Sequence, residues 1–288
     1  MTIPRISPIL LATAFALTGC GGGGGGVASL PPPPVTPPPP PPAAPFVLVP
    51  AATTSQQFAV AGSSHLTAGD GTPRLGAADQ LQVRYVASSN SYEVELPDSQ
   101  TWIPLTRRSE SEAAGGGVTV LVPRPNYQYS TLIEWYGDNS LAGVEGLGIA
   151  TASGGVPVTG SATYTAYAEG VTSEKTSSQL INPQVLGTMT LNFNFAQGSL
   201  SGNLSMVLDP EWHDYQLGPL NFTQTVYSTG STTFSGKFDT DLAGLNKFSG
   251  LFTGPHAEEL IGNFAFPYQS PIDSHTYQAD GAFVGKRP

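Results

Sequence analysis

A regular alternation of apolar and polar residues between positions 188 and 208 is the feature that most limits how this chain can fold. The apolar positions are Met189, Leu191, Phe193 and Phe195, followed after a turn near Gly198 by Leu200, Leu204, Met206 and Leu208. Successive side chains of a strand point to opposite faces of a sheet. The pattern therefore predicts a long antiparallel hairpin with one apolar face.

Similar runs recur through the second half of the chain, at 129–137, 146–153, 160–172, 219–228, 231–239, 248–253, 260–268 and 276–284. Helix signals are scarce, and glycines inside the runs permit strong bending. We predict an all-β fold whose residues 129–288 form an antiparallel β-barrel of about eight strands, with a β-sandwich as the main alternative. We expect Phe193, Phe195 and Phe222 to point inward, which argues against an open cavity in the barrel.

Residues 46–128 are interpreted as a separate, small β-rich domain. The run at 81–96 predicts a hairpin in which Leu81, Val83 and Tyr85 face Tyr92, Val94 and Leu96. Polar loops at 62–80 and 97–117 surround this hairpin, and the second loop contains three consecutive glycines.

The N-terminus has the features of an export signal. Arg5 precedes an apolar stretch at 6–17 that is too short to span a bilayer, which takes about 20 residues. The following Leu17-Thr18-Gly19-Cys20 resembles a bacterial lipobox and predicts a signal peptide at 1–19 with lipid on Cys20, the only cysteine of the chain. Gly21, rather than Asp, follows the cysteine, which by analogy with enterobacterial sorting favours the outer membrane. The alternative is a plain secretory signal.

The segment after Cys20 cannot build a core. Residues 21–45 contain six consecutive glycines and eleven prolines, and neither residue type supports packed secondary structure. We interpret 20–45 as a lipidated, disordered stalk. A proline-rich ligand for SH3-like domains is the alternative.

Composition and spacing exclude several functions. The net charge of −10 argues against nucleic acid or anionic lipid as a partner, because both need a basic face. His65, His213, His256 and His275 lack metal-ligand spacing, and no nucleophile-elbow or phosphate-loop pattern occurs. Glu93 and Glu95 share one strand face and are interpreted as solvated charges. We therefore predict a non-enzymatic protein with no catalytic residues, no cofactor and no metal.

The stretch "SGLFTGPHAEELIGNFAF" near the C-terminus resembles the barrel motif of transferrin-binding protein B-like surface lipoproteins. The matching residues are Gly250, Phe252, Gly254, Pro255, Ala257, Glu259, Gly262 and Phe264. Thr253 and Ile261 depart from the family pattern. The terminal "GAFVGKRP" is similar to the family ending, with Gly281, Phe283, Lys286 and Arg287 in place and Val284-Gly285 departing from it. The resemblance covers about residues 129–287.

This resemblance implies a handle-like domain at 46–128 ahead of the barrel. The matching residues are expected to be structural. Gly254-Pro255 is expected to break a strand, and the Glu259 carboxylate is expected to accept nearby backbone N–H groups at the corner and to pair with Lys286 or Arg287. Family members contact host proteins through handle and barrel loops. Transferrin receptors of the family carry two lobes and this chain has room for one, so transferrin itself is not the expected ligand.

Two groups of side chains are candidates for ligand binding. Trp212, His213 and Tyr215 lie in an expected loop after a strand, where aromatic residues often anchor a partner. Trp102 stands near the basic pair Arg107 and Arg108. The alternative is that each tryptophan is buried, with Trp212 capping the barrel end. A third and weaker candidate is the 244–250 stretch.

Together these features predict an outer-membrane, surface-exposed lipoprotein of a Gram-negative bacterium that binds a protein or a protein-borne nutrient. Two alternatives remain at this stage. One is a periplasm-facing envelope lipoprotein with a structural role, and the other is a carrier of a small ligand inside the barrel. Residual hydrolase activity is the enzymatic alternative.

Overall fold

The computed structural model describes residues 46–66, 73–123, 127–138, 141–174, 184–209 and 214–288. Strands dominate these segments, and one turn of 3-10 helix, η1 (Ala77–Asp79), interrupts them. Over these ranges no helix is long and apolar enough to cross a membrane. The predicted all-β class is confirmed.

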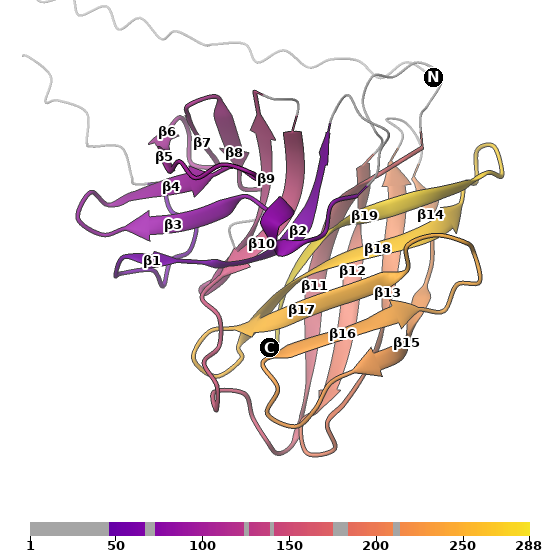
Figure 1. Ribbon diagram of the computed structural model, residues 1–288. Coiled ribbons are helices and arrows are strands. Elements are labelled where there is room, and N and C mark those ends of the chain that lie inside the picture. Colours follow the sequence, from indigo (N-terminus) through magenta and orange to yellow (C-terminus); the bar gives the residue numbers. More distant parts are fainter. Residues whose placement is uncertain (1–45, 67–72, 124–126, 139–140, 175–183, 210–213) are drawn as a thin grey trace, which may run out of the picture. The chain divides into compact units, whose positions relative to one another are not determined.

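Eight antiparallel strands close into a barrel in the C-terminal part of the chain (Figure 1). They are β11 (Ser161–Thr172), β12 (Gln184–Asn194), β13 (Ser199–Asp209), β15 (Leu220–Val226), β16 (Thr233–Phe238), β17 (Lys247–Thr253), β18 (Glu259–Gln269) and β19 (Thr276–Lys286). The ladder runs β12-β11-β19-β18-β17-β16-β15-β13, and pairing of β12 with β13 completes the circle. The two-residue strand β14 (Tyr215–Gln216) adds to β13. The predicted barrel of about eight strands is confirmed.

The hairpin predicted at 188–208 is the pair β12–β13. Its register places Met189 opposite Leu204 and Phe193 opposite Leu200. All four side chains are buried in the barrel interior, as the alternation required. The turn between the strands contains Gly198 at a φ of 61°, a conformation that glycine adopts without steric cost.

Aromatic rings fill the barrel. The ring of Phe193 lies 4.9 Å from that of Phe252 and 5.1 Å from those of Tyr227 and Phe234, measured between centroids. Phe195 stacks on Phe193 at 6.0 Å. Edge-to-face and offset contacts of this kind add to the burial of apolar area, which makes the interior a packed core. Phe222 is half-buried and packs against the same core.

Two further sheets precede the barrel in sequence. The four-stranded sheet has the order β1 (Gln56–Gln57), β3 (Gln82–Val86), β4 (Ser91–Glu95), β5 (Ile103–Pro104). The six-stranded sheet has the order β2 (Ala59–Leu66), β10 (Leu141–Gly148), β9 (Ser130–Gly137), β8 (Val118–Leu121), β7 (Glu112–Gly115), β6 (Thr106–Arg107). The hairpin predicted at 81–96 is β3–β4, with Val83 opposite Val94 and Tyr85 opposite Tyr92.

The runs at 129–137 and 146–153 were expected to be barrel strands. The first corresponds to β9, whereas the second overlaps β10 only at 146–148, and both strands pair outside the barrel. They join β8 and β2 in the six-stranded sheet. β9 is buried on both faces: Ile133 and Trp135 belong to the core of the N-terminal sheets, whereas Leu132 packs with Ile261 and Val284 of the barrel wall. Alternation predicts that a segment is a strand, but it does not predict which strand lies beside it.

A fully buried carboxyl group links the two N-terminal sheets. Glu145 of β10 accepts hydrogen bonds through Oε1 from the backbone N–H of Leu81 and from Nε1 of Trp135, both at 2.9 Å. Its Oε2 has no hydrogen-bond partner among the described residues. Burial raises the pKa of the Glu145 carboxyl to about 8, because the charged form would lose its hydration. The side chain is therefore a neutral acid at neutral pH.

Glu145 should make the stability of the protein depend on pH. Its proton is held more tightly in the folded chain than in the unfolded chain, where the ordinary pKa is 4.5. The free energy of unfolding should therefore fall as the pH rises from about 4.5 to about 8, by up to about 1.4 kcal/mol per pH unit. Glu145→Gln, which resembles the neutral acid, should remove this slope.

Urea unfolding of both proteins at pH 5, 6.5 and 8 measures the effect. The difference between the two proteins isolates Glu145 from the other titrating groups. If the free energies of unfolding of the wild type and of Glu145→Gln changed with pH in the same way, a neutral, buried Glu145 would be contradicted.

Candidate functional site: the barrel corner and the barrel ends

The corner between β17 and β18 carries the sequence motif noted above. β17 ends at Thr253, and Gly254 follows with a φ of 86°, which suits glycine and turns the chain. Ala257 also has a positive φ, is fully buried, and offers its carbonyl oxygen to the hydroxyl of Tyr164. β18 then begins at Glu259. The predicted strand break at Gly254-Pro255 is therefore observed.

Other motif residues pack the wall of the barrel. Phe252 and Phe264 are fully buried in the interior. A Cβ atom on Gly262 would lie 2.1 Å from Cζ of Phe283, and one on Gly250 would lie 2.4 Å from Cζ of Phe234. The two glycines thus make room for these rings, which explains why the motif requires them.

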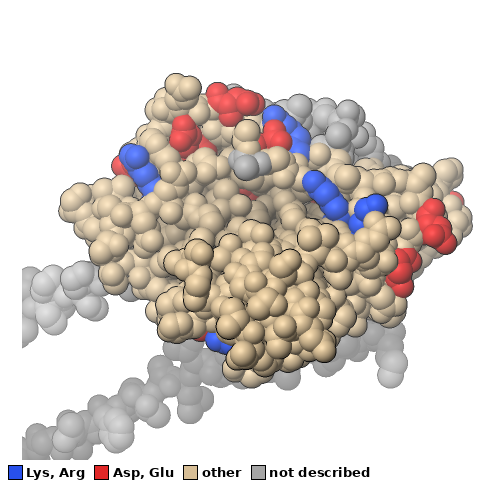
Figure 2. All heavy atoms as spheres, turned by 60° about the horizontal axis from the view of Figure 1, so that its bottom comes forward, with Lys and Arg blue, Asp and Glu red and all other residues tan. Residues whose placement is uncertain are grey.

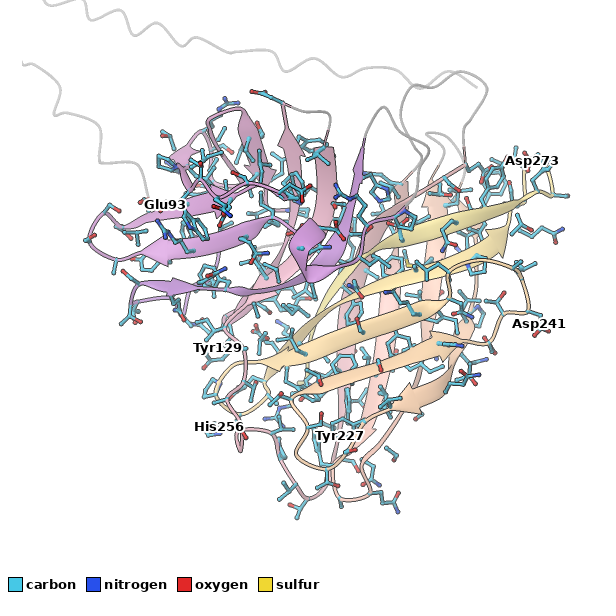
Figure 3. All side chains as sticks on the ribbon, in the orientation of Figure 1. Glu93, Tyr129, Tyr227, Asp241, His256 and Asp273 are labelled. Carbon is cyan, nitrogen blue, oxygen red and sulfur yellow. The ribbon has the colours of Figure 1, made fainter. Side chains whose placement is uncertain are left out.

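Glu259 connects this corner to the segment that leads into β9. Its carboxylate accepts hydrogen bonds from the backbone N–H of Gln128 at 2.7 Å, the backbone N–H of Tyr129 at 2.9 Å and Oγ of Ser130 at 2.7 Å. Tyr129 and the corner at His256 lie close together (Figure 3). Glu259 does accept backbone N–H groups, but the expectation that nearby residues of the corner donate them is wrong, because the donors lie about 130 residues earlier.

The two cations at the C-terminus lie at the same corner. Lys286 stands opposite Glu259 in the β18–β19 ladder, and its Nζ lies 5.6 Å from the centroid of the Tyr127 ring. Arg287 donates a hydrogen bond to the carbonyl oxygen of His256 at 2.9 Å. Both residues therefore help to close the barrel at the end of β19.

The structure describes only some of the side chains that were predicted to bind a ligand. Trp212 and His213 lie outside the described residues, so their binding role stays a prediction. Tyr215 lies in β14, where it is half-buried and packs against the barrel core. Trp102 is half-buried beneath the guanidinium of Arg84, which lies 4.2 Å from the ring centroid.

The basic pair near Trp102 belongs to a different sheet. Arg107 lies in β6 and donates from Nε to the carbonyl oxygen of Ser109 at 3.1 Å. Arg108 is exposed and forms an ion pair with Glu112 at 3.2 Å. The structure assigns Trp102 to the four-stranded sheet, next to β5, and the arginines to the six-stranded sheet.

The described loops between barrel strands lie at the two ends of the barrel. One end, here called the acidic end, includes the described loops 239–246 and 270–275 together with Asp214. Three apolar side chains are exposed on these loops: Leu242, Leu245 and Ile272, at 37%, 40% and 49%. Asp239 and Asp241 are exposed on the first loop, which Lys237 and Lys247 flank, and Asp273 is exposed on the second; Figure 3 shows Asp241 and Asp273 on the two loops. The expected loop at 244–250 is shorter than predicted, because β17 begins at Lys247.

Side-chain hydrogen bonds hold both loops in place. Asn246 bonds to the N–H and carbonyl groups of Phe238, each at 2.9 Å. Gln278 of β19 accepts from the N–H of Leu245 at 3.0 Å and donates to its carbonyl oxygen at 2.9 Å. The acidic end therefore presents its apolar side chains on an ordered framework, which lowers the entropy cost of binding.

The hairpin at 270–275 is ordered in the same way. Asp273 accepts from the N–H of His275 at 3.0 Å and from the hydroxyl of Tyr277 at 2.7 Å, and these bonds lower the pKa of its carboxyl. Beneath the hairpin, the buried Glu174 accepts from the hydroxyls of Tyr268 and Ser270, both at 2.7 Å. A buried polar network thus supports the loop on which the charged and apolar side chains are exposed.

Ser63, His65 and Asp280 form a buried cluster between β2 and β19. Nε2 of His65 lies 2.7 Å from Oδ2 of Asp280, and the hydroxyl of Ser63 donates to the same oxygen. In a hydrolase triad the histidine accepts the proton of the serine. Here the hydroxyl of Ser63 donates to Asp280 and its Oγ also lies 3.2 Å from Nε2 of His65, and the cluster joins β2 of the N-terminal sheet to β19 of the barrel.

Metal binding has no support in the described parts of the chain. Across those ranges, no group of three or more His, Cys, Asp or Glu side chains could hold a metal ion.

Residues 156–287 match the family described as the C-lobe and N-lobe beta barrels of Tf-binding protein B. The match extends from just before β11 to the end of β19 and so includes every strand of the barrel. Over these residues, the chain is similar to a barrel domain of the transferrin-binding protein B family. The corner motif, with Glu259 at its centre, therefore belongs to the architecture of this family barrel.

Solved structures of similar proteins resemble the chain at low identity. A transferrin binding protein B variant from Haemophilus parasuis shares 16% identity, with a TM-score of 0.44, over 80% of this chain and 45% of that one. The isotype 1 protein from Neisseria meningitidis shares 14%, with a TM-score of 0.41, over 80% and 43%. This chain thus spans less than half the length of either protein.

A third structure matches over most of both chains. HpuA from Kingella denitrificans in complex with human haemoglobin shares 12% identity, with a TM-score of 0.41, over 84% of this chain and 90% of that one. No curated protein sequence matches the chain at a significant level. The assignment of the family barrel rests on the match at 156–287, because these identities and TM-scores are low.

Removing the Glu259 carboxylate should destabilise the protein substantially. Glu259→Ala leaves two backbone N–H groups and the Ser130 hydroxyl without their acceptor, and hydrogen bonds to a charged group contribute about 1.5–3 kcal/mol each. We expect the free energy of unfolding to fall by about 3 kcal/mol or more, as measured by urea denaturation. Glu259→Gln, which keeps one acceptor oxygen, should lose less.

The neighbouring glutamate provides a matched control. Glu258 is half-buried in the same corner and accepts one exposed hydrogen bond, from the N–H of His256 at 2.8 Å. Glu258→Ala should cost less than about 1 kcal/mol. Equal losses for the two alanine variants would show that Glu259 has no special structural role.

Proposed function

We propose that this protein is an outer-membrane lipoprotein, displayed on the surface of a Gram-negative bacterium, that binds a nutrient-carrying host protein without catalysing a reaction. Lipid on Cys20 would anchor it, and residues 20–45 would act as the stalk that holds the folded part away from the membrane. The proposal draws on the family of the barrel domain and on the lipobox pattern at residues 17–20.

The observation that carries the binding role is the ordered acidic end of the barrel. Leu242, Leu245 and Ile272 expose apolar area on two neighbouring loops, and Asp214, Asp239, Asp241 and Asp273 are exposed around them. An apolar centre with a charged rim is the usual composition of a protein-binding surface. A partner that suits it would offer an apolar patch bordered by basic side chains.

Two host proteins are the natural first probes. Human haemoglobin is bound by HpuA, and transferrin gives the family its name.

Location is tested by treating intact cells with a protease that does not cross the outer membrane. Loss of the protein from whole cells is expected if the barrel is displayed outside. Protection until the cells are lysed would reject surface display and favour the periplasm-facing alternative. An unrelated periplasmic protein, which must survive in whole cells, serves as the control.

Binding through the acidic end is tested with Leu242→Ala combined with Ile272→Ala. Each truncation removes exposed apolar area from the centre of the proposed contact, so we expect the Kd for haemoglobin, measured by surface plasmon resonance, to rise at least about tenfold. The free energy of unfolding should change by less than about 1 kcal/mol, because both side chains are exposed.

The opposite end of the barrel offers a matched control. Val158 and Val226 are 57% and 64% exposed there, and replacing both with alanine should leave the Kd unchanged. Binding of neither haemoglobin nor transferrin at micromolar concentration would reject the proposed ligand class. A Kd that is unchanged in the acidic-end variant would reject the proposed surface.

A further inference from the structure

A cavity of about 440 Å³ lies between β2 and the outer wall of the barrel. Val60 and Ala61 of β2, with Leu75 and Gln80 from the segment that follows, form one side. The other side consists of β15, the 227–232 turn and strands β16 to β18. Cavities of about 300–1,000 Å³ are typical of small-molecule sites.

The cavity contains no charged side chain among its lining residues. Its polar groups are hydroxyls and amides, which include those of Gln80, Ser231, Thr233, Ser235, Ser249 and Asn263. Three loops at the adjoining barrel end, 149–160, 195–198 and 227–232, also contain no Asp, Glu, Lys or Arg, whereas the corner 254–258 at the same end contains Glu258. Figure 2, in which the lower side of Figure 1 comes forward, shows a wide area there without charged side chains. An ionic ligand would lose hydration here without gaining a counter-charge.

Two polar atoms of lining residues, Oε1 of Gln80 and the hydroxyl of Tyr227, have no hydrogen-bond partner among the described residues. Gln80 is 2% exposed, and its Nε2 donates to the carbonyl oxygens of Arg74 and Gly76, both at 3.2 Å. These two bonds determine the orientation of the amide, and its Oε1 is left without a hydrogen bond. A buried acceptor without a donor is unfavourable. A ligand that brings a hydroxyl or N–H group would satisfy it.

The barrel side of the cavity is held in position. Asn263 accepts from the hydroxyl of Ser249 at 2.8 Å and donates to the carbonyl oxygen of Gly62 at 3.2 Å. A β-bulge interrupts the β15–β16 register between Thr223 and Val226. Val226, which lines the cavity beyond the bulge, is 64% exposed. Bulges often reorient side chains beside binding sites.

We propose that this cavity binds an uncharged, hydroxylated small molecule of the saccharide class, one or two sugar rings in size. Sugar hydroxyls would donate to Oε1 of Gln80 and exchange hydrogen bonds with the hydroxyls of Ser235 and Thr233. Apolar ring faces would contact Leu75 and Leu251. This site is separate from the acidic end, so its occupation does not depend on capture of a host protein.

The test uses the full chain in a detergent without a sugar head group. Saturation-transfer NMR would detect glucose, sucrose and maltose as neutral probes, with glucuronate and glucose 6-phosphate as charged counterparts. We expect at least one neutral sugar to bind, and at least tenfold more tightly than either charged sugar. Binding of none of the neutral sugars, or tighter binding of a charged sugar, would overturn the proposal.

A filling variant assigns the binding to this cavity. Ser235→Ile removes a lining hydroxyl and occupies the space with a β-branched residue that suits a strand, so the Kd for the bound sugar should rise at least tenfold. Ser205→Ile is the matched control, because Ser205 is a half-buried serine on barrel strand β13 that does not line the cavity. Equal Kd values for the two variants would place any sugar binding elsewhere.

Haemoglobin capture by the Ser235→Ile variant separates the two proposals. If the variant still binds haemoglobin but has lost sugar binding, the cavity and the acidic end act independently. If the Ser235→Ile variant unfolds at a clearly lower urea concentration than the wild type, Ser235→Val, a smaller filling residue with the same expected direction, replaces it.

Discussion

Closure of the barrel between β12 and β13 is the constraint on which the rest of the structure depends. These two strands are neighbours in sequence, yet they complete a ladder that passes through all the other barrel strands before it returns to them. Closure removes the free sheet edges, whose unpaired N–H and C=O groups would otherwise invite aggregation. It also encloses one apolar face, so the aromatic rings of Phe193, Phe234 and Phe252 must fill the interior.

The closed barrel leaves its outer wall as the surface on which the N-terminal sheet packs. An apolar layer centred on Leu132, Ile261 and Val284 forms the contact. Polar links border this layer: Glu259 binds the segment before β9, and His65 pairs with Asp280. Hydrogen bonds to buried charges depend strongly on geometry, so they specify one arrangement of the two surfaces better than apolar contact does.

The residues of the family motif stabilise the barrel, and the features that suit binding lie elsewhere, so the motif says little about the ligand. Gly254, Ala257, Glu259 and Gly262 all serve the corner and the wall of the barrel. The features that suit binding lie on the loops at the acidic end and in the cavity beside β2. They depend on exposed or unpartnered groups such as Ile272 and the Oε1 of Gln80, which contribute little to the fold.

The amino-acid sequence alone determined the strands, the two hairpins and the barrel class. These features follow from alternation over a few neighbouring residues and from the turn between them, which are local properties. The pairs Met189–Leu204 and Val83–Val94 are correct for this reason. The corner motif also indicated that the Glu259 carboxylate would accept backbone N–H groups, but it did not identify the donors, which are not contiguous with the corner.

Only the tertiary structure decided which segments meet. β9 and β10 joined the six-stranded sheet, and the donors to Glu259 came from a segment far away in sequence. The contact of Ser63 with Asp280 joins residues 217 positions apart, and the cavity at Gln80 arises where β2 meets the barrel wall. Such contacts depend on how whole sheets pack, and a pattern with a period of two residues contains no information about that packing.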